Sequence, residues 1–101
     1  MTRGTTPTIV LTLDTDLPLN DIAELWVTFK ASTVEVTKNL SDVSLDSVNK
    51  KITLELSQED TLKLYNGKCE VQVRFRTGND LAYATSIASV DINRILKEGV
   101  I

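Results

Sequence analysis

The sequence predicts an all-β, immunoglobulin-like antiparallel β-sandwich of about seven strands with one short helix. Three observations predict this fold. Val, Ile and Thr, whose β-branched side chains suit a pleated sheet, account for 30 of the 101 residues. Apolar and polar residues alternate in several short segments, which is typical of strands covered on one face. Turn-forming residues separate these segments, and the length suits one domain over residues 1–101.

Each expected strand in the first half of the chain follows a polar segment. Residues 1–7 are polar and predict a flexible lead-in, or an edge strand with Pro7 at its start. Three alternating segments follow, whose inward residues are Ile9, Leu11 and Leu13, then Leu25, Val27 and Phe29, then Val34 and Val36. A fourth strand is expected between the polar segments 39–42 and 47–51.

The second half of the chain contains the clearest alternation. Its inward residues are Ile52, Leu54 and Leu56, followed by Cys69, Val71, Val73 and Phe75. The last strand precedes the C-terminal segment and alternates less clearly. Together these patterns predict strands at 8–13, 22–30, 33–38, 43–46, 51–56, 69–76 and 81–92.

One short helix is expected near residues 57–64, before the sixth strand. Ser57 offers an N-cap hydroxyl and Asp60 a carboxylate three residues later, which is close to a capping box. Tyr65 follows the helix and stands four residues before Cys69. One interpretation of Tyr65 is a tyrosine corner, with the phenol bonded to backbone near Asp60.

The composition excludes several classes of function. The net charge is −3, from 11 Lys and Arg against 14 Asp and Glu, which argues against a nucleic-acid partner. The chain has no His, the commonest general base and metal ligand, and a single Cys, so we expect no disulfide, metal or cofactor. The longest aliphatic run is Ile9–Leu11, so we expect a soluble protein with no membrane partner.

Three groups of residues could carry chemistry, and each also has an ordinary structural interpretation. The acidic loop 14–21 offers oxygen ligands of the kind calcium prefers, but Asp and Asn are also common turn formers. Arg74 and Arg76 share one strand face, which indicates either an anion site or a solvated surface. Cys69 continues an apolar stripe and has no His to activate it, so we expect a buried, unreactive thiol.

Trp26 is the first candidate binding residue. Because Leu25, Val27 and Phe29 occupy the inward face of their strand, Trp26 is expected to point outward. An exposed Trp can anchor a protein interface or provide a stacking platform for a sugar. The alternative is that a loop or the terminal segment covers it. Tyr83 could be a second exposed aromatic, although its strand does not assign it to a face.

The C-terminal segment is the second candidate. Ile95, Leu96, Val100 and Ile101 place four aliphatic side chains within the last eight residues. A free tail is normally polar, because clustered exposed aliphatics favour association. These residues therefore either cover the open end of their own sandwich or dock on a second copy or another protein.

Four segments resemble a known family: the opening Arg3-Gly4-Thr5-Thr6-Pro7-Thr8, the helix entry 56–64, the strand 71–77 and the ending 94–101. Together they resemble short proteins encoded by prophages of Firmicutes, whose members look like tail or baseplate components. They are also similar to the N-terminal immunoglobulin-like domain of phage baseplate upper proteins, which docks a receptor-binding assembly onto the tail. The resemblance covers nearly the whole chain.

The resemblance implies a non-enzymatic structural or assembly module of the virion, made in the cytoplasm of the bacterial host. Its implied partners are other tail or baseplate proteins, with self-association as a further option, and it implies no catalytic residues. The alternative function is a carbohydrate-binding module of a phage or cell-surface protein that uses Trp26. An enzyme is disfavoured because the sequence lacks His and a paired-acid motif.

Overall fold

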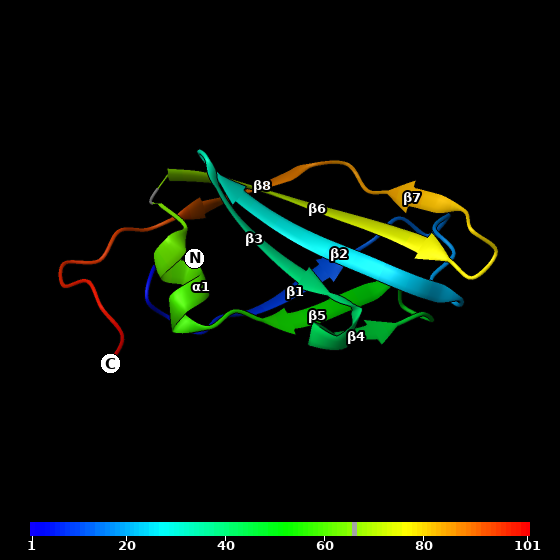
Figure 1. Cartoon of the computed structure of the whole chain (residues 1–101), viewed down its shortest axis with the longest axis horizontal. Coiled ribbons are helices and arrows are strands. Elements are labelled where there is room, and N and C mark those ends of the chain that lie inside the picture. The colour runs from blue at the N-terminus through cyan, green and yellow to red at the C-terminus, as the bar shows by residue number, and fades with distance from the viewer. Residues whose placement is uncertain (66) are drawn as a thin grey trace.

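The computed structural model describes residues 1–65 and 67–101. Within these residues, eight strands, one α-helix and one 3₁₀ turn follow one another along the chain (Figure 1). They are β1 (Thr8–Thr12), β2 (Ile22–Ala31), β3 (Val34–Asn39), the 3₁₀ turn (Leu40–Asp42), β4 (Val43–Asp46), β5 (Lys51–Glu55), α1 (Gln58–Lys63), β6 (Gly67–Thr77), β7 (Ala82–Ala84) and β8 (Ala88–Ile92). The prediction of an all-β antiparallel sandwich with one short helix is confirmed.

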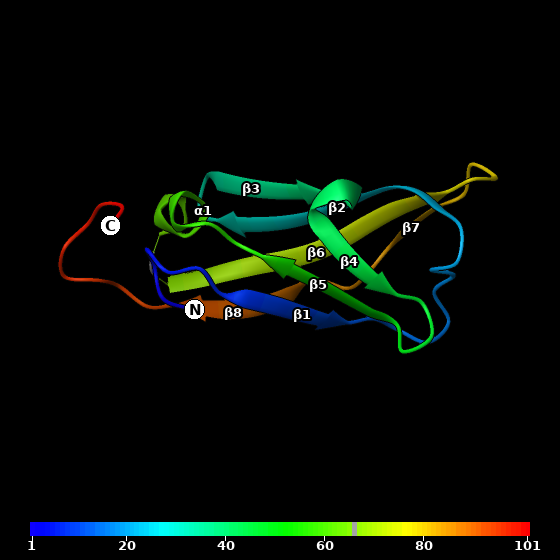
Figure 2. The same cartoon turned by 90° about the horizontal axis from the view of Figure 1, so that it is seen from below.

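The strands form two antiparallel sheets that pack face to face (Figure 2). The smaller sheet has the order β1-β5-β4, and the larger has the order β3-β2-β6, with β7 and β8 both paired to the far side of β6. The second strand thus pairs with the third and the sixth, whereas in an immunoglobulin constant domain it lies in the sheet of the first and fifth strands. The molecule measures 47 × 23 × 20 Å, and the strands run roughly along its long axis.

The core lies between the two sheets and consists of the side chains that the alternation predicted to point inward. In the larger sheet, the register places Leu25 opposite Phe75 and Val27 opposite Val73, so the inner faces of β2 and β6 are continuous. Burial of each large apolar side chain contributes about 1.5–3 kcal/mol. The buried apolar residues are Leu13, Leu19, Leu25, Val27, Phe29, Ala31, Val36, Ile52, Leu54, Leu56, Leu64, Cys69, Val71, Val73, Phe75 and Ile92.

The predicted strand at 81–92 is wrong in one respect, because the structure divides it into β7 and β8. At the interruption, the Thr85 N–H donates to the Val73 carbonyl at 2.9 Å, while the Thr85 hydroxyl accepts from the Val73 N–H at 3.1 Å. Gln72 Nε2 also donates to the Thr85 carbonyl at 2.9 Å. A side-chain oxygen thus replaces a backbone carbonyl in the ladder, which is why eight strands replace the expected seven.

The helix forms where it was predicted, with a complete capping box at its start. The Asp60 N–H donates to the Ser57 hydroxyl at 3.1 Å, and the Ser57 N–H donates to Asp60 Oδ2 at 3.0 Å. Asp60 therefore fills the role that Glu or Gln usually plays in this motif. Lys38 Nζ lies 2.7 Å from Asp60 Oδ2, and this ion pair ties α1 to β3.

Two expectations from the sequence, the tyrosine corner at Tyr65 and the flexible lead-in at residues 1–7, are wrong. Tyr65 is 55% exposed and lies beside Arg3, rather than in the buried position of a tyrosine corner. Residues 1–7 are also not a free lead-in, because Met1–Arg3 runs along the end of β8. The Arg3 N–H donates to the Asn93 carbonyl at 3.1 Å, and the Asn93 N–H donates to the Met1 carbonyl at 2.7 Å.

Candidate functional site

Trp26 lies on the outer face of the larger sheet, as the alternation of β2 predicts. Its neighbours Leu25 and Val27 are fully buried, whereas Trp26 is 50% exposed. The interpretation that a loop or the terminal segment covers this side chain is therefore wrong. Half of a large amphipathic ring is available for contact, which is the property of an aromatic anchor in an interface.

Two arginines of β6, Arg74 and Arg76, lie on the same sheet face as Trp26, and Arg74 contacts its ring. The register places Trp26 opposite Arg74 and Glu24 opposite Arg76. The Arg74 guanidinium lies 5.8 Å from the centre of the Trp26 ring, and Arg76 Nη1 lies 3.9 Å from Asp80 Oδ1. An exposed cation–π contact of this kind contributes about 0.5–1 kcal/mol, so it orients the two side chains more than it stabilises the fold.

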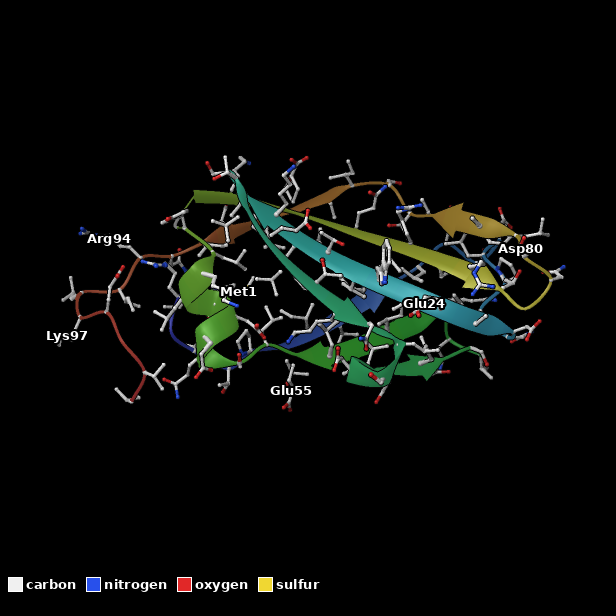
Figure 3. The ribbon with its side chains drawn as sticks, in the orientation of Figure 1. Met1, Glu24, Glu55, Asp80, Arg94 and Lys97 are labelled. Carbon is white, nitrogen blue, oxygen red and sulfur yellow. The ribbon has the colours of Figure 1, made fainter. Side chains whose placement is uncertain are left out.

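A hollow of about 230 Å³ lies beside the indole. Ala82 of β7 lies opposite Arg76 and lines this hollow, and its short side chain leaves space beside the long side chains of β6. We call this the Trp26 surface, and its lining residues are Glu24, Leu25, Trp26, Arg74, Phe75, Arg76, Ala82 and Tyr83. Figure 3 shows Glu24 on this part of the molecule.

Tyr83 is not a second exposed platform comparable to Trp26. It is partly buried, and its ring stacks on the core residue Phe75 with a centroid distance of 5.3 Å and an interplanar angle of 22°. The register places Tyr83 opposite Phe75, on the inner side of the sheet edge. The sequence could not assign this face, because β7 has only three residues and two of them are Ala.

The C-terminal segment begins with a residue that packs on its own domain. Ile95 is partly buried, and its Cδ1 lies 3.2 Å from the position that a Cβ on Gly4 would take. Leu62 of α1 approaches the same position at 3.5 Å. Gly4 also has a φ of 72°, a left-handed conformation that other residues rarely adopt. The left-handed φ therefore favours glycine at this position, and a larger residue would also press on the Ile95 side chain.

The Arg3 side chain bonds both to the C-terminal end of α1 and to the C-terminal segment of the chain. Its side chain is buried, with Nε donating to the Leu64 carbonyl at 2.9 Å and Nη2 donating to the Leu62 carbonyl at 2.6 Å. These are carbonyls at the C-terminal end of α1, where the helix itself supplies no donor. Nη1 forms an ion pair with Glu98 of the C-terminal segment, and the guanidinium lies 5.9 Å from the Tyr65 ring centre.

The last residues return to the start of the helix. The Ile101 N–H donates to Gln58 Oε1 at 2.9 Å, and Gln58 Nε2 donates to the Ile101 carbonyl at 3.2 Å. The segment is thus attached at both ends, yet its Leu96 side chain is 94% exposed, that of Val100 is largely exposed and that of Ile101 is fully exposed. Of the four candidate aliphatic residues, Ile95 is partly buried beside Gly4 and Leu62, and the other three lie on the surface.

The two candidate surfaces lie far apart. Figure 3 shows Arg94 and Lys97 on the segment that extends beyond the sandwich, and Glu24 and Asp80 toward the opposite end. Sequence reasoning found Trp26 and the aliphatic residues, but it missed Arg3 and Gln58. Their polar side chains are ordinary at a chain end and in a short helix, and only the fold brings them to the C-terminal segment.

The acidic loop 14–21 and Cys69, which the sequence offered as possible chemical groups, have the ordinary structural roles of a turn and a buried core residue. In the acidic loop, the Leu17 N–H donates to the Asp14 carbonyl at 3.2 Å, which is turn chemistry. Across residues 1–65 and 67–101, no cluster of three or more Cys, Asp or Glu side chains could hold a metal ion. Cys69 is fully buried, and this burial raises the pKa of its thiol, which keeps it protonated.

The comparisons with known proteins give no relative. No family model, no curated protein and no solved structure matches the chain. In the part of the chain that the structure describes, no helix has both the length and the apolar character needed to cross a membrane. The fold and its two exposed surfaces are therefore the observations from which a function is inferred.

Proposed function

We propose that this chain is a non-enzymatic structural or assembly module of a phage or prophage tail or baseplate. In this proposal it is located in the virion after synthesis in the host cytoplasm, and it acts by binding other tail or baseplate proteins. The resemblance of segments 3–8, 56–64, 71–77 and 94–101 to prophage tail proteins supports the setting. The β-sandwich scaffold is compatible with a binding role, although fold alone does not define function.

The anchored C-terminal segment is the observation that carries the proposal. Arg3 and Gln58 hold its backbone and Glu98 in place, while Leu96 and Ile101 project into solvent. An apolar surface that is already ordered loses little conformational entropy when it docks. Exposed aliphatic residues on a fixed segment are therefore suited to fit an apolar groove of a neighbouring protein.

Incorporation into phage particles tests the proposal directly. A tagged chain is expressed in a lysogen of the source bacterium, the prophage is induced, and purified particles are probed for the tag. We expect the wild type in tail or baseplate structures and a large loss of incorporation for the triple variant Leu96→Ser, Val100→Ser and Ile101→Ser. Val48→Ser is the matched control, because Val48 is a highly exposed aliphatic residue of the β4–β5 turn.

Two outcomes contradict the proposal in different ways. Absence of the wild-type chain from particles would remove the virion role altogether. Normal incorporation of the folded triple variant would instead retain the role and exclude the C-terminal segment as its interface.

The Trp26 surface supports a second candidate function, the binding of a carbohydrate. A half-exposed indole beside a hollow of about 230 Å³, with carboxylate and guanidinium groups at its rim, can stack on a sugar ring and bond its hydroxyls. Trp26 is the only Trp in the sequence, so its fluorescence reports on this surface alone. Titration with cell-wall polysaccharide fragments should shift the emission if a sugar stacks there.

Two substitutions separate stacking from other effects. Because both remove the only Trp, their binding is measured by titration calorimetry, with the wild type measured in the same way. Binding should survive in Trp26→Phe, which keeps a ring, and be lost in Trp26→Ala, with a cost of about 1–3 kcal/mol for a stacking contact. Unchanged emission across a panel of polysaccharides would exclude this second function.

A further inference from the structure

Strand β1 is an open and uncharged sheet edge. Within the described residues it pairs only with β5, and its sequence is Thr-Ile-Val-Leu-Thr. The other edge strands have features that discourage pairing with another chain, namely charged side chains, short length or a covering segment. β3 contains Glu35 and Lys38, β4 ends at Asp46, β7 has three residues, and Met1–Arg3 pairs along the end of β8.

The hydrogen-bond register determines which backbone groups of β1 face outward. The Leu13 N–H donates to the Lys50 carbonyl, and the Leu56 N–H donates to the Pro7 carbonyl. Because direction alternates along an antiparallel strand, the odd-numbered residues from Pro7 to Leu13 bond toward β5. Thr8, Val10 and Thr12 therefore direct their N–H and C=O groups to the open edge.

We infer that β1 pairs with β1 of a second copy across a twofold axis at Val10, which joins the two smaller sheets into one antiparallel sheet. This register places Val10 opposite Val10 of the second copy, and Thr8 opposite Thr12. All three outward-facing residues then exchange both of their backbone hydrogen bonds with the partner. Registers centred on Ile9 or Leu11 would leave an outward-facing residue at one strand end without a partner from β1.

The side chains suit the same register. Ile9 and Leu11 point inward and are only partly buried, and Leu11 lines a groove of about 510 Å³ between β1 and the interrupted edge at 84–88. Pairing sets Ile9 opposite Leu11 of the second copy, so both are covered. On the outer face Val10 is 55% exposed, and it gains a β-branched partner, a favourable cross-strand pair.

The self-complementarity of β1 identifies the occupant as a second copy in antiparallel orientation, because its three outward-facing residues supply the donors and acceptors on both sides of the axis, and the charges of the two smaller sheets are arranged with opposite signs. In the smaller sheet, Glu55 lies opposite Thr8 and Lys51 lies opposite Thr12. In the inferred sheet, one cross-strand row therefore reads Glu55, Thr8, then Thr12 and Lys51 of the second copy, and symmetry repeats it. A parallel arrangement would instead place like charges at the two ends of each row. These charges lie three strand spacings, about 14 Å, apart, so their interaction is weak and the backbone bonds contribute most to the choice of register.

Sedimentation analysis over a range of concentrations tests the inference. We expect a species of twice the 11.2 kDa chain mass at concentrations up to about 1 mM, where weak complexes form. Val10→Pro should raise the dissociation constant about tenfold or more, because it removes both central hydrogen bonds. The Val10 N–H takes no part in pairing with β5, so the monomer should remain folded.

Two further variants control this measurement. Val10→Thr keeps the N–H and the β-branched shape and should dimerise like the wild type. Val10→Lys places like charges opposite each other across the axis and should abolish the dimer even if Val10→Pro fails to fold. A chain that stays monomeric at about 1 mM overturns the inference. So does a dimer that withstands Val10→Lys and dissociates only in the triple variant of Leu96, Val100 and Ile101.

Disulfide trapping tests the register independently. Opposite residues of a bonded antiparallel pair lie about 5.5 Å apart between Cα atoms, within the range of a disulfide. Val10→Cys should therefore crosslink two copies under mild oxidation, whereas Thr8→Cys should not, since its counterpart is Thr12. The natural Cys69 is buried, so the wild-type chain should not crosslink and serves as the control. Efficient crosslinking of Thr8→Cys with none of Val10→Cys would overturn the proposed axis. The inference stands or falls independently of the proposed role in the virion.

Discussion

Arg3 shows most clearly how far a residue's environment can differ from its sequence context. It lies in a polar opening segment, yet it is buried and donates to two carbonyls at the end of α1. A buried charge is tolerated only where hydrogen bonds and an opposite charge compensate it, and here Glu98 and the two carbonyls do so. One side chain thus connects the N-terminus, the helix and the C-terminal segment.

Replacement of Arg3 should therefore destabilise the whole domain. We expect Arg3→Ala to lower the free energy of unfolding by about 2–3 kcal/mol, because the carbonyls of Leu62 and Leu64 lose charge-assisted donors. Arg3→Lys should recover little of this loss, since an ammonium cannot reproduce the planar fork. Urea unfolding checks both variants, with the exposed Arg94→Ala as the control. Equal stability of Arg3→Ala and Arg94→Ala would contradict the role assigned to Arg3.

Cys69 should be unreactive in the native protein. Burial raises the pKa of its thiol and the side chain is fully enclosed, so neither thiolate nor access is provided. A thiol reagent at neutral pH should label Cys69 only after denaturant is added, as measured by mass spectrometry. Fast labelling of the native chain would indicate that β6 is shifted by one residue, because such a shift reverses every side chain.

Among the elements, α1 depends on contacts outside itself. It has six residues, too few to be stable alone, and its capping box and the Lys38–Asp60 ion pair hold it against β3. Burial alone would raise the pKa of Asp60, but the bonds from Lys38 and Ser57 outweigh it and hold the pKa below its usual range. The ionised carboxylate is therefore the form that stabilises the helix.

Asp60→Asn should lower the free energy of unfolding by about 2 kcal/mol at neutral pH, through loss of the ion pair and part of the cap. A carboxylate whose pKa is lower in the folded state stabilises the protein above its unfolded pKa, and this contribution disappears as the pH falls toward the folded pKa. The difference between wild type and Asp60→Asn should thus shrink as the pH falls below the ordinary Asp value of 3.8. Urea unfolding as a function of pH measures it. A constant difference would exclude the carboxylate as the source.

The C-terminal segment divides into a structural part and an exposed part. Truncation after Arg94 removes Ile95 from its contact with Gly4 and Glu98 from Arg3, so we expect a loss of about 1–2 kcal/mol at every protein concentration. The triple variant of Leu96, Val100 and Ile101 should melt within a few degrees of the wild type, since these side chains are exposed. Calorimetry compares the two. A triple variant as unstable as the truncation would show that the exposed residues belong to the core.

At the scale of the whole molecule, the long axis of 47 Å distinguishes the possible assemblies. Pairing through β1 adds the second copy across the strands, so it should widen the particle with little change in its length. Association through the C-terminal segment would join copies near their ends and nearly double the length. Small-angle scattering across a concentration series should therefore show a rising radius of gyration with a maximum dimension that increases only modestly and stays well below twice the monomer value. A maximum dimension that approaches twice the monomer value would contradict side-by-side pairing.

The sequence by itself determined the features that depend on neighbouring residues. A period of two assigns an inward and an outward face to each strand, so the core stripes of β2 and β6 and the outward position of Trp26 followed from alternation alone. The capping box of α1 is likewise local, because Ser57 and Asp60 are three residues apart. Most strand bounds were accurate to within one or two residues for the same reason.

Only the tertiary structure decided the features that join distant segments. The placement of β2 between β3 and β6, the interruption at Thr85, the burial of Arg3 and the division between Ile95 and the three exposed aliphatic residues all depend on partners far away in the chain. An alternating strand presents the same backbone donors and acceptors to any neighbour, so its pattern does not specify which strand it pairs with. That choice belongs to the packing of the complete core, in which all the side chains must be buried together.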